Sequence, residues 1–201
     1  MNALDLIHST DHELVAFART GSEKAYRELL GRYERPVFSL VYRMVRDREL
    51  AEDLAQETFV KVFNHLETFN PKYKFSSWIF KIANNLAIDS LRKKQVQTVS
   101  LDGSRHATTA EEADASRISV ASSEENPEEL LEARELGREI ERAIGSLRIE
   151  YRTAVVLRHV EGRSYEEIAE IMEVPLGTVK TFIHRARLEL REILEHVRVE
   201  M

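Results

Sequence analysis

A segment without helical periodicity divides this 201-residue chain into two halves. Residues 97–126 are rich in Ser, Thr, Ala and acidic side chains, whereas apolar residues on either side recur every three or four positions. Because a segment of this composition buries too little apolar surface to fold, it predicts a flexible acidic linker. We therefore expect two small domains, at residues 1–96 and 127–201, joined by a linker at 97–126.

An all-α fold is expected for both halves. Seven Gly and four Pro are few for a fold with many tight turns between strands, and the apolar stripes have the period of core-facing helices. Ser, Thr or Asp, which cap the N-termini of helices, stands before each of these apolar stripes in the first half. In the first half they predict four helices, starting at Thr10, Ser22, Asp47 and either Ser76 or Ser77.

Several classes of protein are disfavoured. With no Cys, the chain has neither a disulfide framework nor a thiolate metal site. No signal peptide starts the sequence, and no uncharged apolar run approaches the roughly 18 residues of a membrane span. The expectation is a cytoplasmic protein without membrane insertion.

Catalytic and metal chemistry are also disfavoured. His8 and His12 are four residues apart, but their neighbours complete no ligand set. The segment "GTVK" at 177–180 lacks the first Gly and the Lys-Ser/Thr ending of a phosphate-binding loop. The carboxylates occupy no defensible catalytic pair. We therefore expect no enzyme, no catalytic residue, no metal and no other cofactor.

The segment "SYEEIAEIMEVPLGTVKTFIHRARLEL", residues 164–190, fits a helix-turn-helix template. Ala169 is the small residue at the helix crossing, Pro175 suits the turn, and Glu173 stands where many such units have Gly. Apolar residues expected to fill the wedge between the helices are Ile168, Met172, Val174 and Val179. The complete template predicts a DNA-reading unit.

The second helix of this unit has one apolar and one basic side. At 100° per residue, Val179, Ile183, Ala186 and Leu190 share a side, and Lys180, Thr181, His184, Arg185, Arg187 and Arg191 spread over the remaining arc. A basic stripe alone would equally fit an ordinary solvated helix. Since the net charge is -6, we expect weak DNA binding by the protein alone.

Aromatic and basic residues alternate before and within the fourth predicted helix. They are Lys72, Tyr73, Lys74, Phe75, Trp78, Phe80 and Lys81, followed by Arg92, Lys93 and Lys94. This composition suits stacking on unpaired bases beside a phosphate-binding track, and Asn84 and Asn85 could bond the edges of flipped bases. The alternative is that Phe75, Trp78 and Phe80 simply belong to the core.

Three consecutive segments together resemble the extracytoplasmic-function sigma factors of bacterial RNA polymerase. They are "ELAEDLAQETFVKVFNHLETFNP", "KFSSWIFKIANNLAIDSLRKK" and the helix-turn-helix segment, and the resemblance covers about residues 11–96 and 127–195. It implies a transcription initiation factor with three kinds of partner and no small-molecule substrate. These partners are core RNA polymerase (the coiled coil of the largest subunit and the flap of the second-largest), promoter DNA and an anti-sigma factor.

The resemblance also implies site residues. Core-polymerase binding would fall to Asp53, Gln56, Glu57, Lys61 and Asn64. Reading of the melted −10 element would fall to Phe69, Lys72, Lys74, Trp78, Lys81, Asn84, Asn85, Asp89 and Arg92. Duplex −35 recognition would fall to Thr178, Lys180, Thr181, Phe182, His184, Arg185 and Arg187. The family often has a basic residue at the position of Phe182, which could instead fill the wedge.

Two other classes compete with this interpretation. A stand-alone regulator, such as a repressor or a response-regulator output unit, can carry a similar helix-turn-helix. Its sensor half, if a receiver, would need alternating strands and a phosphorylatable Asp, and the first half shows neither. A membrane-surface adaptor would need a basic amphipathic helix or an anchor, which the sequence lacks.

Overall fold

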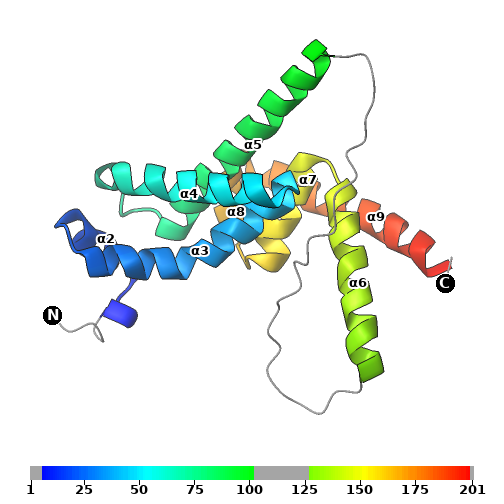
Figure 1. The fold of residues 1–201 in the computed structure, drawn as a ribbon, viewed down its shortest axis with the longest axis horizontal. Helices are drawn as coiled ribbons and strands as arrows, with labels where there is room; N and C mark the ends of the chain where they lie inside the picture. Colours follow the sequence, from blue (N-terminus) through cyan, green and yellow to red (C-terminus); the bar gives the residue numbers. More distant parts are fainter. Residues whose placement is uncertain (1–5, 102–126, 200–201) are drawn as a thin grey trace.

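The computed structural model describes the backbone of residues 6–101 and 127–199, and these residues form helices and connecting turns without a strand (Figure 1). The first half contains α2 (Asp11–Arg19), α3 (Glu23–Val45), α4 (Arg48–Asn64), the short 3-10 helix η1 (Leu66–Thr68) and α5 (Phe75–Leu101). The second half contains α6 (Pro127–Ser146), α7 (Ile149–Val155), the π-helical turn η2 (Val156–Val160), α8 (Tyr165–Met172) and α9 (Leu176–Val199). The all-α prediction is confirmed.

Local side-chain caps start three helices of the first half where the sequence predicts them. The Thr10 hydroxyl accepts from the Glu13 N–H, while the Glu13 carboxylate accepts from the Thr10 N–H at 2.7 Å. Ser22 and Asp47 accept in the same way at the starts of α3 and α4. These bonds satisfy amide groups that a helix leaves unpaired at its N-terminus.

The two ends of α5 differ from the prediction. Neither Ser76 nor Ser77 caps the helix, because α5 already starts at Phe75, whose ring is fixed in the core 5.4 Å from that of Tyr33. At its other end α5 continues past residue 96 to Leu101, since the first Gly or Pro after Pro71 is Gly103. The rest of the predicted linker, 102–126, lies outside the described residues.

Helix α3 lies at the centre of the fold. It packs against α2, α4 and α5 in the first half and against α6 and α7 in the second. Buried apolar side chains from both halves form one continuous cluster, including Leu40, Met44, Leu157 and Ile168. A second contact between the halves places α8 along α5. The halves are therefore in direct contact.

The C-terminal part of α5 and the N-terminal part of α6 project from this body on opposite sides (Figure 1). None of the described helices combines the length and hydrophobicity that crossing a bilayer requires.

Candidate nucleic-acid and protein interfaces

The outer face of α4 carries all five residues predicted to bind polymerase. Their side chains are exposed, and Lys61 pairs with Glu57 at 3.0 Å; the five are Asp53, Gln56, Glu57, Lys61 and Asn64. Val60, which was not predicted, is 57% exposed on the same helix. It follows Gln56 by four residues and precedes Asn64 by four, so helical spacing could have identified it. An apolar centre with a polar rim is typical of a protein-binding surface.

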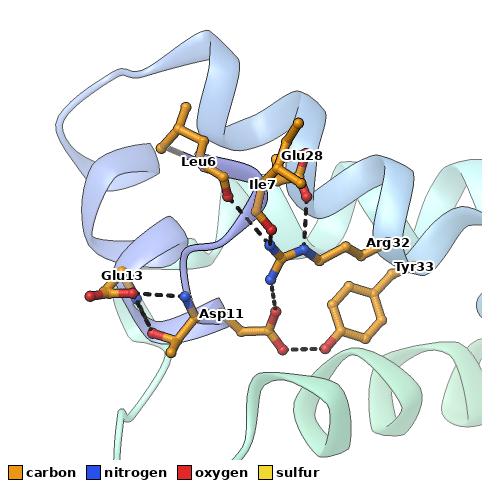
Figure 2. A network of polar contacts seen from close by, with 8 residues as sticks. Leu6, Ile7, Asp11, Glu13, Glu28, Arg32 and Tyr33 are labelled. Atoms are coloured by element: carbon orange, nitrogen blue, oxygen red, sulfur yellow. Dashed lines mark hydrogen bonds and ion pairs between the residues drawn. The ribbon is translucent and has the colours of Figure 1, made fainter. Parts of the chain in front are cut away.

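A polar network fixes α2 on α3 (Figure 2). The Arg32 guanidinium donates to Asp11 at 3.0 Å, to Glu28 at 2.9 Å and to the Ile7 carbonyl at 2.9 Å. The Tyr33 hydroxyl donates to the other Asp11 oxygen, and burial together with this bond raises the pKa of Tyr33 well above its ordinary value. The network gives α2 a defined position relative to the core.

From this position α2 holds the loop that precedes α5. The Arg19 guanidinium donates to the carbonyls of Leu66 (2.9 Å), Glu67 (3.2 Å) and Phe69 (2.6 Å). His12 Nε2 lies 2.9 Å from the Pro71 carbonyl and 3.2 Å from that of Tyr73. Because carbonyls only accept, this nitrogen carries a proton.

The sequence predicted no role in the loop for Arg19 or His12, since both act on segments about fifty or more residues away. His12 thus contacts the backbone of the loop through its side chain. No group of three or more His, Asp or Glu side chains within the described part of the chain could hold a metal ion.

Four aromatic residues at the loop separate into buried and exposed members. Phe69 is only 3% exposed and Phe75 1%, with their ring centroids 5.6 Å apart. Trp78 is half-buried on top of them, 5.3 Å from Phe69, and Tyr73 is 54% exposed. In this structure Phe69 is thus a core residue that supports Trp78. Tyr73 and Trp78 are the accessible rings.

The −10 candidates on the loop and α5 also differ in accessibility. Lys72, Lys74, Asn85, Asp89 and Arg92 are exposed, and Lys81 is half-buried. Asn84 is only 2% exposed, and its Oδ1 has no hydrogen-bond partner among the described residues. The carbonyl oxygen of Asn84 is thus a buried acceptor without a donor.

The helix-turn-helix forms as predicted. Ser164 and Glu167 make a capping box at the start of α8, and Ile168 and Val179 are fully buried between α8 and α9. Met172 and Val174 are half-buried against the same core. Glu173 ends α8 in the left-handed conformation with φ 55°, which explains why Gly is common at this position.

The exposed arc of α9 contains most of the residues predicted to read the −35 element. Lys180, Thr181, His184, Arg185 and Arg187 are exposed, while Thr178 is half-buried. Phe182 is different, because its ring packs 5.6 Å from that of Tyr151 and against the core. Of its two proposed roles, the structure shows the packing one.

Two arginines of this arc have partners outside α9. Arg185 donates to the Tyr151 hydroxyl at 3.2 Å, which raises the pKa of Arg185. Arg187 donates to His159 Nε2 at 3.3 Å, so this nitrogen must be unprotonated. Burial first, and then the charges of Arg187 and Arg158, lower the pKa of His159. Both partners orient the arginines, and nothing local in the sequence indicates either contact.

The geometry agrees with comparisons to known proteins. Residues 29–96 match the family described as Sigma-70 region 2, which includes α4, the loop and most of α5. Residues 137–190 match Sigma-70 region 4, which includes the helix-turn-helix. The two matches lie on the two halves of the chain.

Other sigma factors match this chain over nearly its whole length, so that one relative covers both halves. The chain is 35% identical over 179 residues to the ECF RNA polymerase sigma factor SigW of Bacillus subtilis, covering 88% of this chain and 92% of that protein. It is 38% identical over 179 residues to the ECF RNA polymerase sigma-E factor of Escherichia coli, covering 89% and 91%. The fold matches the sigma factor RpoE of Bartonella quintana, crystallised with the anti-sigma factor NepR, with a TM-score of 0.68, 23% identity and coverage of 86% and 98%. The chain therefore belongs to the extracytoplasmic-function family of RNA polymerase sigma factors, which are transcription initiation factors and not enzymes.

Proposed function

We propose that this chain binds core RNA polymerase and directs it to promoters by reading the −35 element as duplex and the −10 element as a melted strand. The observation that carries the proposal is the arc of α9, where Lys180, His184, Arg185 and Arg187 face solvent while Val179, Ile183 and Ala186 are buried. A helix with one side anchored and the other basic can enter the major groove.

Within α9, the proposed roles differ by position. Arg185, held by Tyr151, is directed to a base edge, because a guanidinium can donate two bonds to a guanine. We assign contacts with DNA phosphates to Arg187 and Thr178. Phe182 keeps α9 seated on α7 and makes no base contact, which follows from its packing on Tyr151.

The proposed strand-reading surface combines the loop and α5. Tyr73 and Trp78 offer rings on which unpaired bases can stack, and Lys72 and Arg92 offer exposed charge to phosphates. Asn84 Oδ1 is an acceptor that the amine of an extruded base could satisfy. Phe69 is assigned a supporting role beneath Trp78.

The exposed face of α4 is the proposed docking site for the coiled coil of the largest polymerase subunit. Val60 supplies its apolar centre, and Asp53, Gln56 and Asn64 supply its polar rim. The second half is assigned to the flap of the second-largest subunit. An anti-sigma factor is the proposed regulator, since the similar sigma factor of Bartonella quintana was crystallised with one.

Reconstitution with core polymerase, followed by mapping of transcript starts on genomic DNA, tests this function. We expect starts at a defined set of promoters, with Val60→Glu abolishing them and the exposed-site control Glu34→Lys on α3 leaving them unchanged. Arg185→Ala should weaken binding to the preferred −35 sequence by about 1–3 kcal/mol, with a smaller loss on other sequences. Tight, sequence-specific duplex binding without polymerase would instead identify a stand-alone regulator.

A further inference from the structure

Three basic side chains lie together at one edge of the duplex-reading arc of α9. Arg187 of α9 donates to His159 Nε2 at 3.3 Å, and Arg158 precedes His159 in η2. The positive charges of both arginines act on the His159 ring, and the side chains of His159 and Arg187 are exposed. In the proposed function only Arg187 of these three contacts DNA. His159 is therefore a titratable group without a role, bonded to a proposed phosphate contact.

Arg158 is held in place by the segment that leads into α8. Its guanidinium donates to the Arg163 carbonyl at 2.9 Å and lies 5.1 Å from the centre of the Tyr165 ring. A side chain that is already ordered loses little conformational entropy when it binds an anion. Arg158 and Arg187 thus place two cations beside His159, one from η2 and one from α9.

We propose that His159 is a phosphate-binding residue for the −35 duplex and that it takes up a proton from solvent when it binds. In the free protein Nε2 accepts from Arg187, so the ring is neutral. A DNA phosphate that binds Arg187 competes with Nε2 for the guanidinium and places an anion beside the ring. The protonated ring can then donate to the same phosphate. This inference rests on the proposed function of α9.

The charges around His159 favour the neutral ring in the free protein. Burial, and then the positive charges of Arg187 and Arg158, lower the pKa of His159. The Glu161 carboxylate follows two residues later but accepts from Ser39 of α3 at 2.8 Å. Other charged residues on helices that pack against η2 interact with different groups: Arg43 of α3 with Glu141, Arg152 of α7 with the Met44 carbonyl, and Glu166 of α8 with Arg158 and Lys180. An arriving phosphate would instead favour the protonated ring.

Affinity for the −35 duplex should therefore rise as pH falls. The phosphate stabilises the protonated ring, so the pKa of His159 is higher in the DNA complex than in the free protein. Binding takes up a proton wherever the pH lies between these two pKa values, and the gain in affinity levels off below the lower one. A difference of about one between the two pKa values corresponds to a change of about tenfold in affinity.

Binding of the reconstituted polymerase to a fluorescent promoter duplex at several pH values tests this role. Between about pH 8 and about pH 6, wild-type affinity should rise roughly three- to tenfold more than that of His159→Gln. The glutamine oxygen can still accept from Arg187 but takes up no proton. His8→Gln is the matched control, because it removes another exposed histidine, outside the proposed DNA surfaces, and should keep the wild-type response.

A second variant and a second measurement distinguish charge from packing. His159→Lys is cationic throughout this pH range, so at about pH 8 it should bind roughly three- to tenfold more tightly than wild type. At about pH 6 the slope of log affinity against log salt concentration should be less steep for His159→Gln by about 0.9, which corresponds to one phosphate contact. Preferred and scrambled −35 sequences should lose affinity equally, because phosphates carry no sequence information.

Equal pH responses of wild type and His159→Gln would overturn the proposal, as would equal salt slopes at about pH 6. A loss of affinity in His159→Gln that is the same at every pH would identify a purely structural residue and would also overturn it. Thermal melting of each variant confirms that folded protein is compared. The proposed function fails separately, if the wild-type polymerase complex produces no promoter-specific starts.

Discussion

The two DNA-reading surfaces of this protein differ in how available they are. On α9 the proposed base and phosphate contacts face solvent, and their internal partners, Tyr151 and His159, orient them without covering them. On α5 the corresponding Lys81 is half-buried against Glu173, and Asn84 is almost fully buried. The proposed strand contacts are therefore divided, because Tyr73, Asn85 and Arg92 are exposed like the contacts on α9, whereas Lys81 and Asn84 are covered by the protein itself.

Among the changes considered, loss of Arg19 should disrupt the strand-reading surface most severely. Arg19→Ala removes the donors to three loop carbonyls and should lower the free energy of unfolding by about 1.5–3 kcal/mol. Promoter opening by the reconstituted polymerase should fall further than the loss of folded protein explains. Chemical denaturation and permanganate reactivity of melted thymines measure the two effects.

Arg27→Ala is the matched control for Arg19. Arg27 forms one exposed ion pair with Glu23, so its removal should change stability by less than about 1 kcal/mol. If the two variants behave alike, Arg19 does not shape the loop.

Tyr73 offers a change that separates stacking from stability. Because its ring is 54% exposed, Tyr73→Ala should leave the free energy of unfolding nearly unchanged while weakening strand binding by polymerase-bound protein by about 1–3 kcal/mol. Tyr73→Phe keeps the stacking face and should bind normally. Fluorescence titration with the −10 strand measures the effect, and unchanged binding by Tyr73→Ala would remove Tyr73 from the surface.

The smallest expected effect concerns His159 beside the duplex-reading surface. Since its pKa in the folded protein lies below the ordinary value of 6.5, the unfolded chain takes up the proton first as pH falls. Stability should therefore decrease slightly as pH is lowered through about 6.5 and level off below the folded pKa. Arg187→Ala should raise the pKa of His159, as followed by NMR, and an unchanged pKa would contradict the contact.

Features that depend on neighbouring residues in the sequence could be predicted from it. The caps at Thr10, Ser22 and Asp47, the wedge of the helix-turn-helix and the exposed face of α4 all follow from local spacing. Features that depend on distant segments could not. No local pattern connects Arg19 with the loop, or Lys81 with Glu173.

Phe69 and Phe182 show that local sequence also fails to predict whether an aromatic ring packs in the core or contacts DNA. Phe69 lies in a loop without periodicity, so its sequence neighbourhood does not distinguish a core ring from a stacking ring. Phe182 lies between the apolar and basic sides of α9, and only the position of Tyr151 assigns it to packing. In both cases the tertiary neighbour determines the role.

The distance between the two halves in solution tests their direct contact most directly. The chain contains no Cys, so Glu34→Cys on α3 and Glu170→Cys on α8 provide two unique, exposed sites for spin labels. In the free protein we predict one narrow distance distribution, which becomes broader when Glu141→Arg removes the ion pair between Glu141 on α6 and Arg43 on α3. A broad distribution in the free wild-type protein would contradict a fixed contact between the halves.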